Sequence, residues 1–351
     1  MQFELERPDF RLVVDAHVPG QGVTALFGRS GCGKTTLLRC VAGLEPAARG
    51  RLVVNGETWQ DRTHHIPVDR RPIGYVFQEG FLFPHLSVGQ NLLYGYRRIP
   101  PKQRVVQPEE AIRLLGLESL LARHVTEISG GQRQRVAIGR ALLTSPRVLL
   151  MDEPLAALDA ISKAEILPYL ERLHDELSIP MLYVSHSLEE VYRLADYMLL
   201  LEDGRVRAAG SLQDLLTRAD LPLAHAEDAA AVIAATIIRH DDRHHLTELE
   251  FAGGSLVISR QSLALSARIR VRILACDVAI NLSAPQDSSV LNCLPAQVLD
   301  VSADPHPGHV LVRLAVGSAT LLSRITRRSL ERLALQPGMR VYALVKSVGI
   351  T

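Results

Sequence analysis

Nine consecutive residues near the start of the chain have the types and spacing that bind a polyphosphate. Gly28-Arg29-Ser30-Gly31-Cys32-Gly33-Lys34-Thr35-Thr36 follows the apolar run 23–27 and leads into the apolar stretch 37–42. Glycines let such a loop curl so that its N–H groups form an anion nest at a helix N-terminus. We expect Lys34 to reach the β- and γ-phosphates and the Thr35 hydroxyl to bind the Mg²⁺ between them. The loop therefore predicts a nucleotide site; the alternative is a glycine-rich turn without a ligand.

Further polar side chains follow apolar runs that are typical of buried strands. Asp152 and Glu153 follow the run 148–151, Gln78 follows the run 73–77, and His186 comes shortly after the run 181–184. The carboxyl ends of parallel strands meet at one edge of a sheet, where ligands collect. Asp152 is therefore the expected Mg²⁺ partner, and Glu153 is placed to polarise the attacking water as a general base. For each residue taken alone, the alternative is a helix cap or a structural role.

A second anion-receptive helix N-terminus is predicted at Ser129, where a serine and two glycines precede the helical pattern 136–143. The residues involved are Ser129, Gly130, Gly131 and Gln132. One domain does not need two such sites for one nucleotide. If two copies meet head to tail, the serine helix of each can close over the γ-phosphate held by the other.

The order of these motifs resembles that of the nucleotide-binding subunit of ATP-binding cassette (ABC) transporters over about residues 1–220. Walker A corresponds to 28–36, the Q-loop to Gln78, the signature to 128–132 and Walker B to 148–152. Ile128 stands where the family usually has leucine, a volume-conserving change. The resemblance implies these roles: Glu153, His186 and Gln78 in catalysis; Thr35, Gln78 and Asp152 at Mg²⁺; Asp159 in the D-loop; and Phe10 as the aromatic that stacks on adenine.

Strand and helix signals alternate through residues 1–228 and predict an α/β domain with a mainly parallel sheet. Residues 2–19 predict a hairpin, and Asn55-Gly56 predicts a tight turn between two strands. The helical pattern at about 81–145 indicates an insertion into this core. With the resemblance, the expected fold is a P-loop NTPase with a RecA-like core and a helical subdomain.

The segment 229–351 has a different character, because strand patterns dominate and the segment repeats itself. The stretch 253–260 matches 317–324, and 270–280 matches 340–350. Two copies of one small β-unit, at about 229–283 and 288–351, are the simplest interpretation. Chance similarity between strands is the alternative.

The whole chain most resembles the ATPase subunits of bacterial molybdate importers, whose tails carry two OB-like repeats of the TOBE, or molybdate-binding, type. The supporting stretches are 75–78, 82–85, 275–278 and 346–351, and 288–295 resembles the family's oxyanion-binding segment. Leu291 stands where that family often has arginine. The resemblance implies oxyanion ligands at Ser289, Asn292, Lys346 and Ser347; a purely structural dimerisation domain is the alternative.

Composition limits the partners that the chain can have. Its 351 residues carry a net charge of +1, which gives no hint of nucleic-acid binding, and its four cysteines lack C-x-x-C spacing. No apolar run approaches the roughly 20 residues needed to span a bilayer. Any membrane association must therefore come through a partner. The resemblance implies a homodimer that is peripheral to the inner membrane at its cytoplasmic face. Its implied partners are permease subunits and, through them, a periplasmic or extracellular oxyanion-binding protein.

The resemblance implies that the dimer hydrolyses ATP with Mg²⁺ to power uptake of molybdate, with tungstate as an analogue. The alternatives are another cargo (sulfate, ferric iron, a polyamine or a sugar) or an ABC ATPase outside transport. Because Cys32 lies inside the phosphate loop, we also expect thiol alkylation to inhibit the protein and ATP to protect it.

Overall fold

The computed structural model describes residues 1–350, which divide by their contacts into two compact units. Unit 1 is Met1–Gly210 and unit 2 is Ser211–Thr351. The sequence-based domain boundary at residue 228 stays a prediction, but the segment 211–228 packs within unit 2: α7 (Leu212–Leu216) contacts β11 (Ala230–Asp241), and Ala224 joins a small apolar cluster with Ala229 and Ala275. No helix in the described part of the chain is long and apolar enough to cross a membrane.

Unit 1 is built on a 10-stranded mixed sheet within residues 1–350, in the order β5-β4-β1-β2-β10-β9-β3-β8-β7-β6. Strands β9, β3, β8, β7 and β6 pair in parallel, whereas β5, β4, β1 and β2 pair antiparallel. The bounds are β1 Gln2–Arg7, β2 Phe10–Asp15, β3 Val23–Phe27, β4 Arg49–Val54, β5 Glu57–Gln60, β6 Ile73–Val76, β7 Val148–Asp152, β8 Met181–Val184, β9 Tyr197–Glu202 and β10 Arg205–Ser211.

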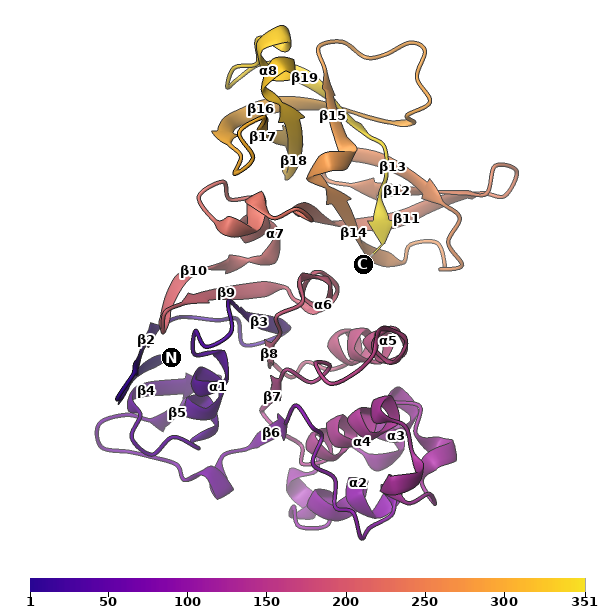
Figure 1. Cartoon of the computed structure of the whole chain (residues 1–351). Coiled ribbons are helices and arrows are strands. Elements are labelled where there is room, and N and C mark those ends of the chain that lie inside the picture. Colours follow the sequence, from indigo (N-terminus) through magenta and orange to yellow (C-terminus); the bar gives the residue numbers. More distant parts are fainter. Residues whose placement is uncertain (351) are drawn as a thin grey trace. The chain divides into compact units, whose positions relative to one another are not determined.

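The helices of unit 1 are α1 Lys34–Ala42, α2 Val88–Tyr96, α3 Pro108–Leu114, α4 Gly130–Leu142, α5 Ala160–Glu176 and α6 Leu188–Leu194. Helices α2 and α3 both pack on α4, so the expected helical insertion forms a group of its own beyond β6 (Figure 1). Strand β8 is buried along its whole length and β7 along all but its last residue, as expected of parallel strands covered on both faces.

The two predicted hairpins of unit 1 are present. Strands β1 and β2 pair in register from Gln2–Asp15 to Arg7–Phe10. Strands β4 and β5 turn at Asn55 and Gly56, whose φ angles of 47° and 83° are those of a two-residue turn with both central residues left-handed. The two hairpins of the antiparallel half therefore come from local pairing, whereas the pairing of β1 with β4 and the parallel half join strands far apart in the chain.

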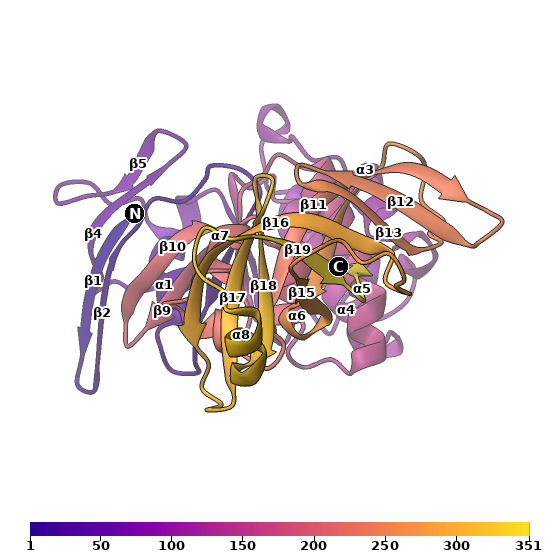
Figure 2. The ribbon, with the colours of Figure 1, turned by 90° about the horizontal axis from the view of Figure 1, so that it is seen from above.

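Unit 2 contains two five-stranded sheets among its described residues, ordered β13-β12-β11-β14-β20 and β15-β19-β16-β17-β18. The neighbouring strands β16, β17 and β18 can be followed in Figure 2. Besides α7 and β11, the elements are β12 Leu246–Phe251, β13 Gly254–Ser259, β14 Arg268–Leu274, β15 Val278–Asn281, β16 Asn292–Ala303, β17 His309–Val316, β18 Ala319–Thr326, α8 Arg327–Leu333, β19 Arg340–Val345 and β20 Gly349–Ile350.

The last strand of each repeat pairs with the other repeat. Strand β15 follows the first four strands in sequence, but it pairs with β19 of the second sheet. Strand β20 closes the second repeat, but it pairs with β14 of the first sheet. The predicted repeat limits, 229–283 and 288–351, therefore do not coincide with the limits of the sheets.

The two sheets of unit 2 share one apolar core. Ile237 and Leu249 of the first sheet and Leu314 and Leu321 of the second are fully buried in the same cluster. The hairpin turns of the two repeats also touch: a Cβ on Gly317, where φ is 60°, would lie 2.2 Å from the carbonyl oxygen of Ala252. Only glycine fits this approach, so the matching glycines of the two repeats serve to pack the turns together.

Candidate nucleotide site

The phosphate loop connects the end of β3 to the start of α1, as the sequence predicts. Lys34 is buried, and its Nζ donates to the carbonyl oxygens of Gly28 (2.8 Å) and Arg29 (3.0 Å). Gly33 caps α1 with a φ of 103°, and a Cβ there would lie 2.6 Å from Cζ of Phe10. Glycine is thus required both by the left-handed backbone and by the ring above it.

A cavity of about 450 Å³ lies over this loop. Phe10, Lys34, Thr35 and Glu153 all line it, together with Ser30, Gly31, Gly33, Thr36, Arg7 and Asp9. The aromatic ring that the resemblance places against adenine therefore borders the same space as the phosphate-binding residues. Arg7 and Asp9, which lie in and just after β1, carry no recognisable sequence pattern and were not predicted as site residues.

Asp152 ends β7 beside the first turn of α1. Thr35 Oγ1 donates to Asp152 Oδ1 at 2.8 Å, and the Tyr75 hydroxyl donates to Asp152 Oδ2 at 3.2 Å. Burial raises the pKa of Asp152, and the two hydrogen bonds partly oppose that rise. Burial, followed by the neighbouring Asp152 carboxylate, also raises the pKa of Tyr75 well above its usual value, which keeps the phenol a proton donor.

The hydroxyl of Thr35 and the carboxylate of Asp152 fit a magnesium ion, because hard oxygen ligands are the ones that Mg²⁺ prefers. Among residues 1–350 no group of three or more His, Cys, Asp or Glu side chains forms a metal-binding cluster. Magnesium bound with a nucleotide usually takes only one or two ligands from the protein, and phosphate oxygens and water supply the rest.

Glu153 and His186 lie close together at the ends of adjacent strands. Nδ1 of His186 is 3.4 Å from Oε2 of Glu153, and the Glu153 side chain is 25% exposed. The φ of Glu153 is 45°, a left-handed conformation that is costly for a residue with a side chain and that gathers at functional sites. The Glu153 N–H donates to the carbonyl of Val184, which fixes the turn after β7 against β8.

The remaining predicted residues of unit 1 lie outside this cavity. Gln78 follows β6 and is exposed. Ser129 caps α4 in a capping box with Gln132, in which each side chain accepts from the other residue's N–H. Asp159 caps α5 and accepts from the Ser162 N–H. Neither Gln78 nor any residue of 129–132 lines the cavity. Their roles at the nucleotide stay predictions.

Cys32 is less accessible than its place in the loop suggests. It is only 6% exposed and belongs to the apolar core of unit 1. Burial raises the pKa of its thiol, and the nearby Lys34 only partly opposes this. A buried thiol with a raised pKa reacts slowly, so the structure favours weak alkylation of Cys32 over the sensitivity that its position in the sequence suggests.

The predicted oxyanion residues of unit 2 do not share one environment. Asn292 is buried, and its amide is used on the backbone of Val257: Oδ1 accepts from the N–H at 2.6 Å and Nδ2 donates to the carbonyl at 3.0 Å. Ser289, Lys346 and Ser347 are exposed, and the Lys346 N–H donates to the carbonyl of Asp277. Their role as oxyanion ligands stays a prediction.

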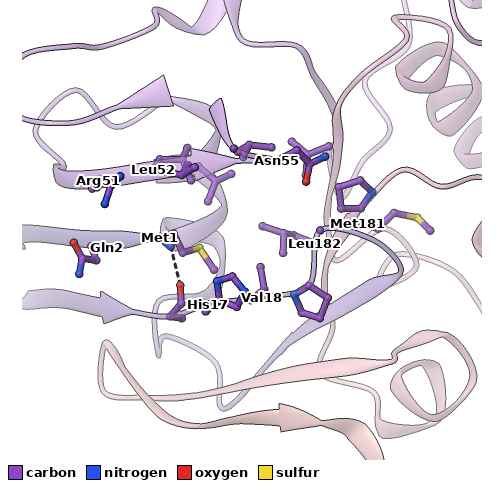
Figure 3. A pocket seen from close by; sticks show the side chains of 18 of the residues that line it. Met1, Gln2, His17, Val18, Arg51, Leu52, Asn55, Met181 and Leu182 are labelled. Carbon is purple, nitrogen blue, oxygen red and sulfur yellow. Dashed lines mark hydrogen bonds between the residues drawn. The ribbon is translucent and has the colours of Figure 1, made fainter. Parts of the chain in front are cut away.

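A larger cavity, of about 540 Å³, lies elsewhere in unit 1 (Figure 3). It borders Val148 and Met181, the first residues of β7 and β8, and the buried side chains of Val41, Leu52 and Leu182. It thus lies at the amino ends of the parallel strands, and it contains no predicted site residue. The smaller cavity at the carboxyl ends is the site that the chemistry supports, because open α/β sheets bind ligands there.

Comparison with known families identifies two regions of the chain. The ABC transporter family matches residues 13–156, and the TOBE domain family matches residues 288–351. The first region includes the phosphate loop, the serine-capped helix and the Asp152-Glu153 pair. The second covers the later β-repeat.

Curated relatives match over nearly the whole chain. The molybdenum import ATP-binding protein ModC of Hahella chejuensis is 56% identical over 348 residues, which are 99% of this chain and 97% of that protein. The molybdenum import ATP-binding protein ModC 1 of Azotobacter vinelandii is 55% identical, again over 99% and 97%. A solved structure, cbiO1 from Clostridium perfringens, part of the ABC transporter complex cbiONQ, is 27% identical with a TM-score of 0.51, over 62% of this chain and 89% of that one.

Proposed function

The chain belongs to the family of molybdenum import ATP-binding proteins of ABC transporters, and on that premise we propose that it hydrolyses ATP to drive uptake of molybdate through a membrane permease. The observation that carries the proposal is identity of 52–56% to relatives of this name over almost the full length of both chains. Tungstate is the expected alternative cargo, because it is a tetrahedral dianion of the same kind.

The proposed roles of the residues follow from the contacts at the carboxyl ends of the parallel strands, around the phosphate loop, which we call the phosphate edge. Lys34 exchanges its bonds to the loop carbonyls for bonds to the phosphates, while the loop N–H groups hold the phosphate oxygens. Glu153 takes the proton of the attacking water, and His186, 3.4 Å away, holds the carboxylate in place. Thr35 and Asp152 would hold Mg²⁺, which would neutralise the charge that develops on the phosphates. Gln78, exposed in the loop after β6, would move toward the ion to join them.

The proposal includes a homodimer with two shared sites. Ser129 opens α4, a helix of 13 residues whose N-terminus carries two glycines and no acidic residue in its first turn. Such an end favours an anion, yet no residue of 129–132 lines the described cavity over the phosphate loop. If a second copy docks head to tail, the Ser129 helix end of each copy would lie at the γ-phosphate held by the other. Asp159 would then lie at the interface between the copies.

The transport partners follow from the same premise. For the proposed function, permease subunits in the membrane carry the cargo, and a binding protein outside the membrane delivers it. We place the chain at the cytoplasmic face of the inner membrane. The helical group of α2, α3 and α4 with the adjoining Gln78 loop is the proposed docking region, because closure around ATP would move it.

The experiment that tests the cargo is transport in cells. Deleting the gene should abolish uptake of radioactive molybdate at low concentration, and expression of the wild-type chain, but not of the Lys34→Ala variant, should restore it. Sulfate, iron, polyamine and sugar uptake, measured in the same strains, provide the controls. Normal molybdate uptake together with loss of one of the control uptakes would contradict molybdate as the cargo. It would leave the proposal of a transport ATPase standing.

A further inference from the structure

Both oxygens of the Asp152 carboxylate are held by hydroxyl groups from different elements. Thr35, in the first turn of α1, donates to Oδ1, and Tyr75, in β6, donates to Oδ2. Strand β6 lies next to β7 with Tyr75 opposite Leu150, so the phenol reaches along its neighbour toward the residue that ends β7. Tyr75 is not among the site residues predicted from the sequence.

The ring of Tyr75 is fixed independently of its hydroxyl. It packs against Phe77 with ring centroids 4.3 Å apart, and it joins the apolar core beside α1 and β7. The hydroxyl is thus delivered by a ring whose position does not depend on the hydrogen bond. A phenol on such a support can hold a carboxylate oxygen at a constant place.

We propose that Tyr75 is a positioning residue for the magnesium site, which it serves by fixing the rotation of the Asp152 carboxylate about its Cβ–Cγ bond. This inference rests on the proposed function. The Cβ–Cγ torsion of aspartate is broad, so the bond from Thr35 alone leaves Oδ2 free to swing. The bond from Tyr75 stops that rotation and keeps Oδ1 turned toward Thr35. Since Mg²⁺ demands near-octahedral geometry, a misplaced carboxylate costs affinity for the ion.

The test is the Tyr75→Phe variant of the full chain, which keeps the ring on Phe77 and removes one oxygen. Binding of a fluorescent ATP analogue is measured across a magnesium titration and again in excess EDTA. The magnesium concentration at half-saturation should rise about three- to tenfold, the effect of one net hydrogen bond. Binding in EDTA should match the wild type, because the nucleotide contacts of Lys34 and the loop are unchanged.

The matched control is Tyr183→Phe. Tyr183, in β8, also donates a buried hydroxyl to a carboxylate, that of Glu190, at 2.9 Å, and Glu190 has no predicted site role. This variant loses the same atom and should keep the wild-type magnesium dependence. A second comparison introduces Tyr75→Phe into an Asp152→Asn background, where it should produce no further change.

Three results would overturn the inference: unchanged magnesium half-saturation in Tyr75→Phe, equal weakening in EDTA, or an added loss in the Asp152→Asn background. Each of them leaves the proposed function standing as long as the wild type binds the nucleotide more tightly with magnesium than without it. A wild-type chain that binds no nucleotide would instead contradict the proposed function.

Discussion

The polar groups at the phosphate edge of unit 1 and those of unit 2 are used in different ways. At the phosphate edge, Thr35 contacts Asp152 and His186 contacts Glu153, and Thr35 and Glu153 line a cavity of about 450 Å³. In unit 2, the amide of Asn292, in the second repeat, hydrogen-bonds the backbone of Val257 in the first repeat. The first arrangement is open to a ligand, whereas the second stabilises the fold.

The two repeats of unit 2 show that even matching residues can differ in this respect. Arg260 of the first repeat corresponds in sequence to Arg324 of the second. Arg324 pairs with Asp304 at 2.9 Å, and the two side chains are 14% and 6% exposed. Arg260 pairs with Asp242 at 3.1 Å, but Asp242 is 85% exposed. The same pair of residue types is therefore structural in one repeat and solvated in the other.

The largest expected effect is at the phosphate edge. Glu153→Gln removes the proposed general base but keeps the size of the side chain, so ATP turnover should fall roughly a hundredfold or more. Binding of ATP should remain, because Lys34 and the loop are unchanged. Phosphate release and nucleotide binding by the full chain check this. Full turnover in the variant would remove Glu153 from the chemistry and weaken the contrast between the two units.

The next effect concerns the buried pair of unit 2. Asp304→Ala leaves the Arg324 guanidinium without its carboxylate and should cost about 2 kcal/mol of stability. Asp242→Ala, the matched control, should leave stability unchanged, because its pair is solvated. Thermal unfolding of the full chain, with hydrogen exchange of residues 230–280 and 292–326, measures both. Equal effects of the two substitutions would show that burial does not distinguish the repeats.

The same pair predicts a dependence on pH. Burial alone would raise the pKa of Asp304, but the His306 N–H and Arg324 hold it below its usual value. A lowered carboxyl pKa contributes stability above the unfolded value, near pH 4, and the contribution is lost as the pH falls through the folded value. The difference between wild type and Asp304→Ala should therefore shrink below about pH 4.

Asn292 can be tested for both uses of a polar group, which are support of the fold and binding of a ligand. If its amide serves the backbone of Val257, Asn292→Ala should destabilise unit 2 by about 1–2 kcal/mol. Ser289→Ala, at an exposed position nearby, should not. Thermal unfolding and molybdate calorimetry on the full chain measure stability and binding together. Loss of molybdate binding at unchanged stability would assign Asn292 to the oxyanion instead.

The sequence could predict what depends on neighbours along the chain. The phosphate loop, the Asn55-Gly56 turn and the buried run 148–151 each carry a local pattern, and the α/β fold with a repeated β-tail is confirmed. It could not predict Tyr75 at Asp152, because that contact joins two strands 77 residues apart. The sequence also carries no local signal that β15 pairs with β19 and β20 with β14, because the pattern of a short strand does not indicate which sheet it joins.

The smallest effect is expected in the reactivity of the cysteines, which depends on how accessible each thiol is to solvent in the two units. Cys276 of unit 2 is exposed, whereas Cys32 and Cys40 of unit 1 are buried, and burial raises the pKa of Cys40 to about 12. Because the thiolate is the reactive form, an alkylating agent near pH 8 should label Cys276 first and Cys32 and Cys40 last. Mass spectrometry of timed samples gives the order, and ATP should not change the rate at Cys276. Fast labelling of Cys32 that ATP suppresses would instead mean that the phosphate loop opens in solution far more than the contacts of Cys32 indicate.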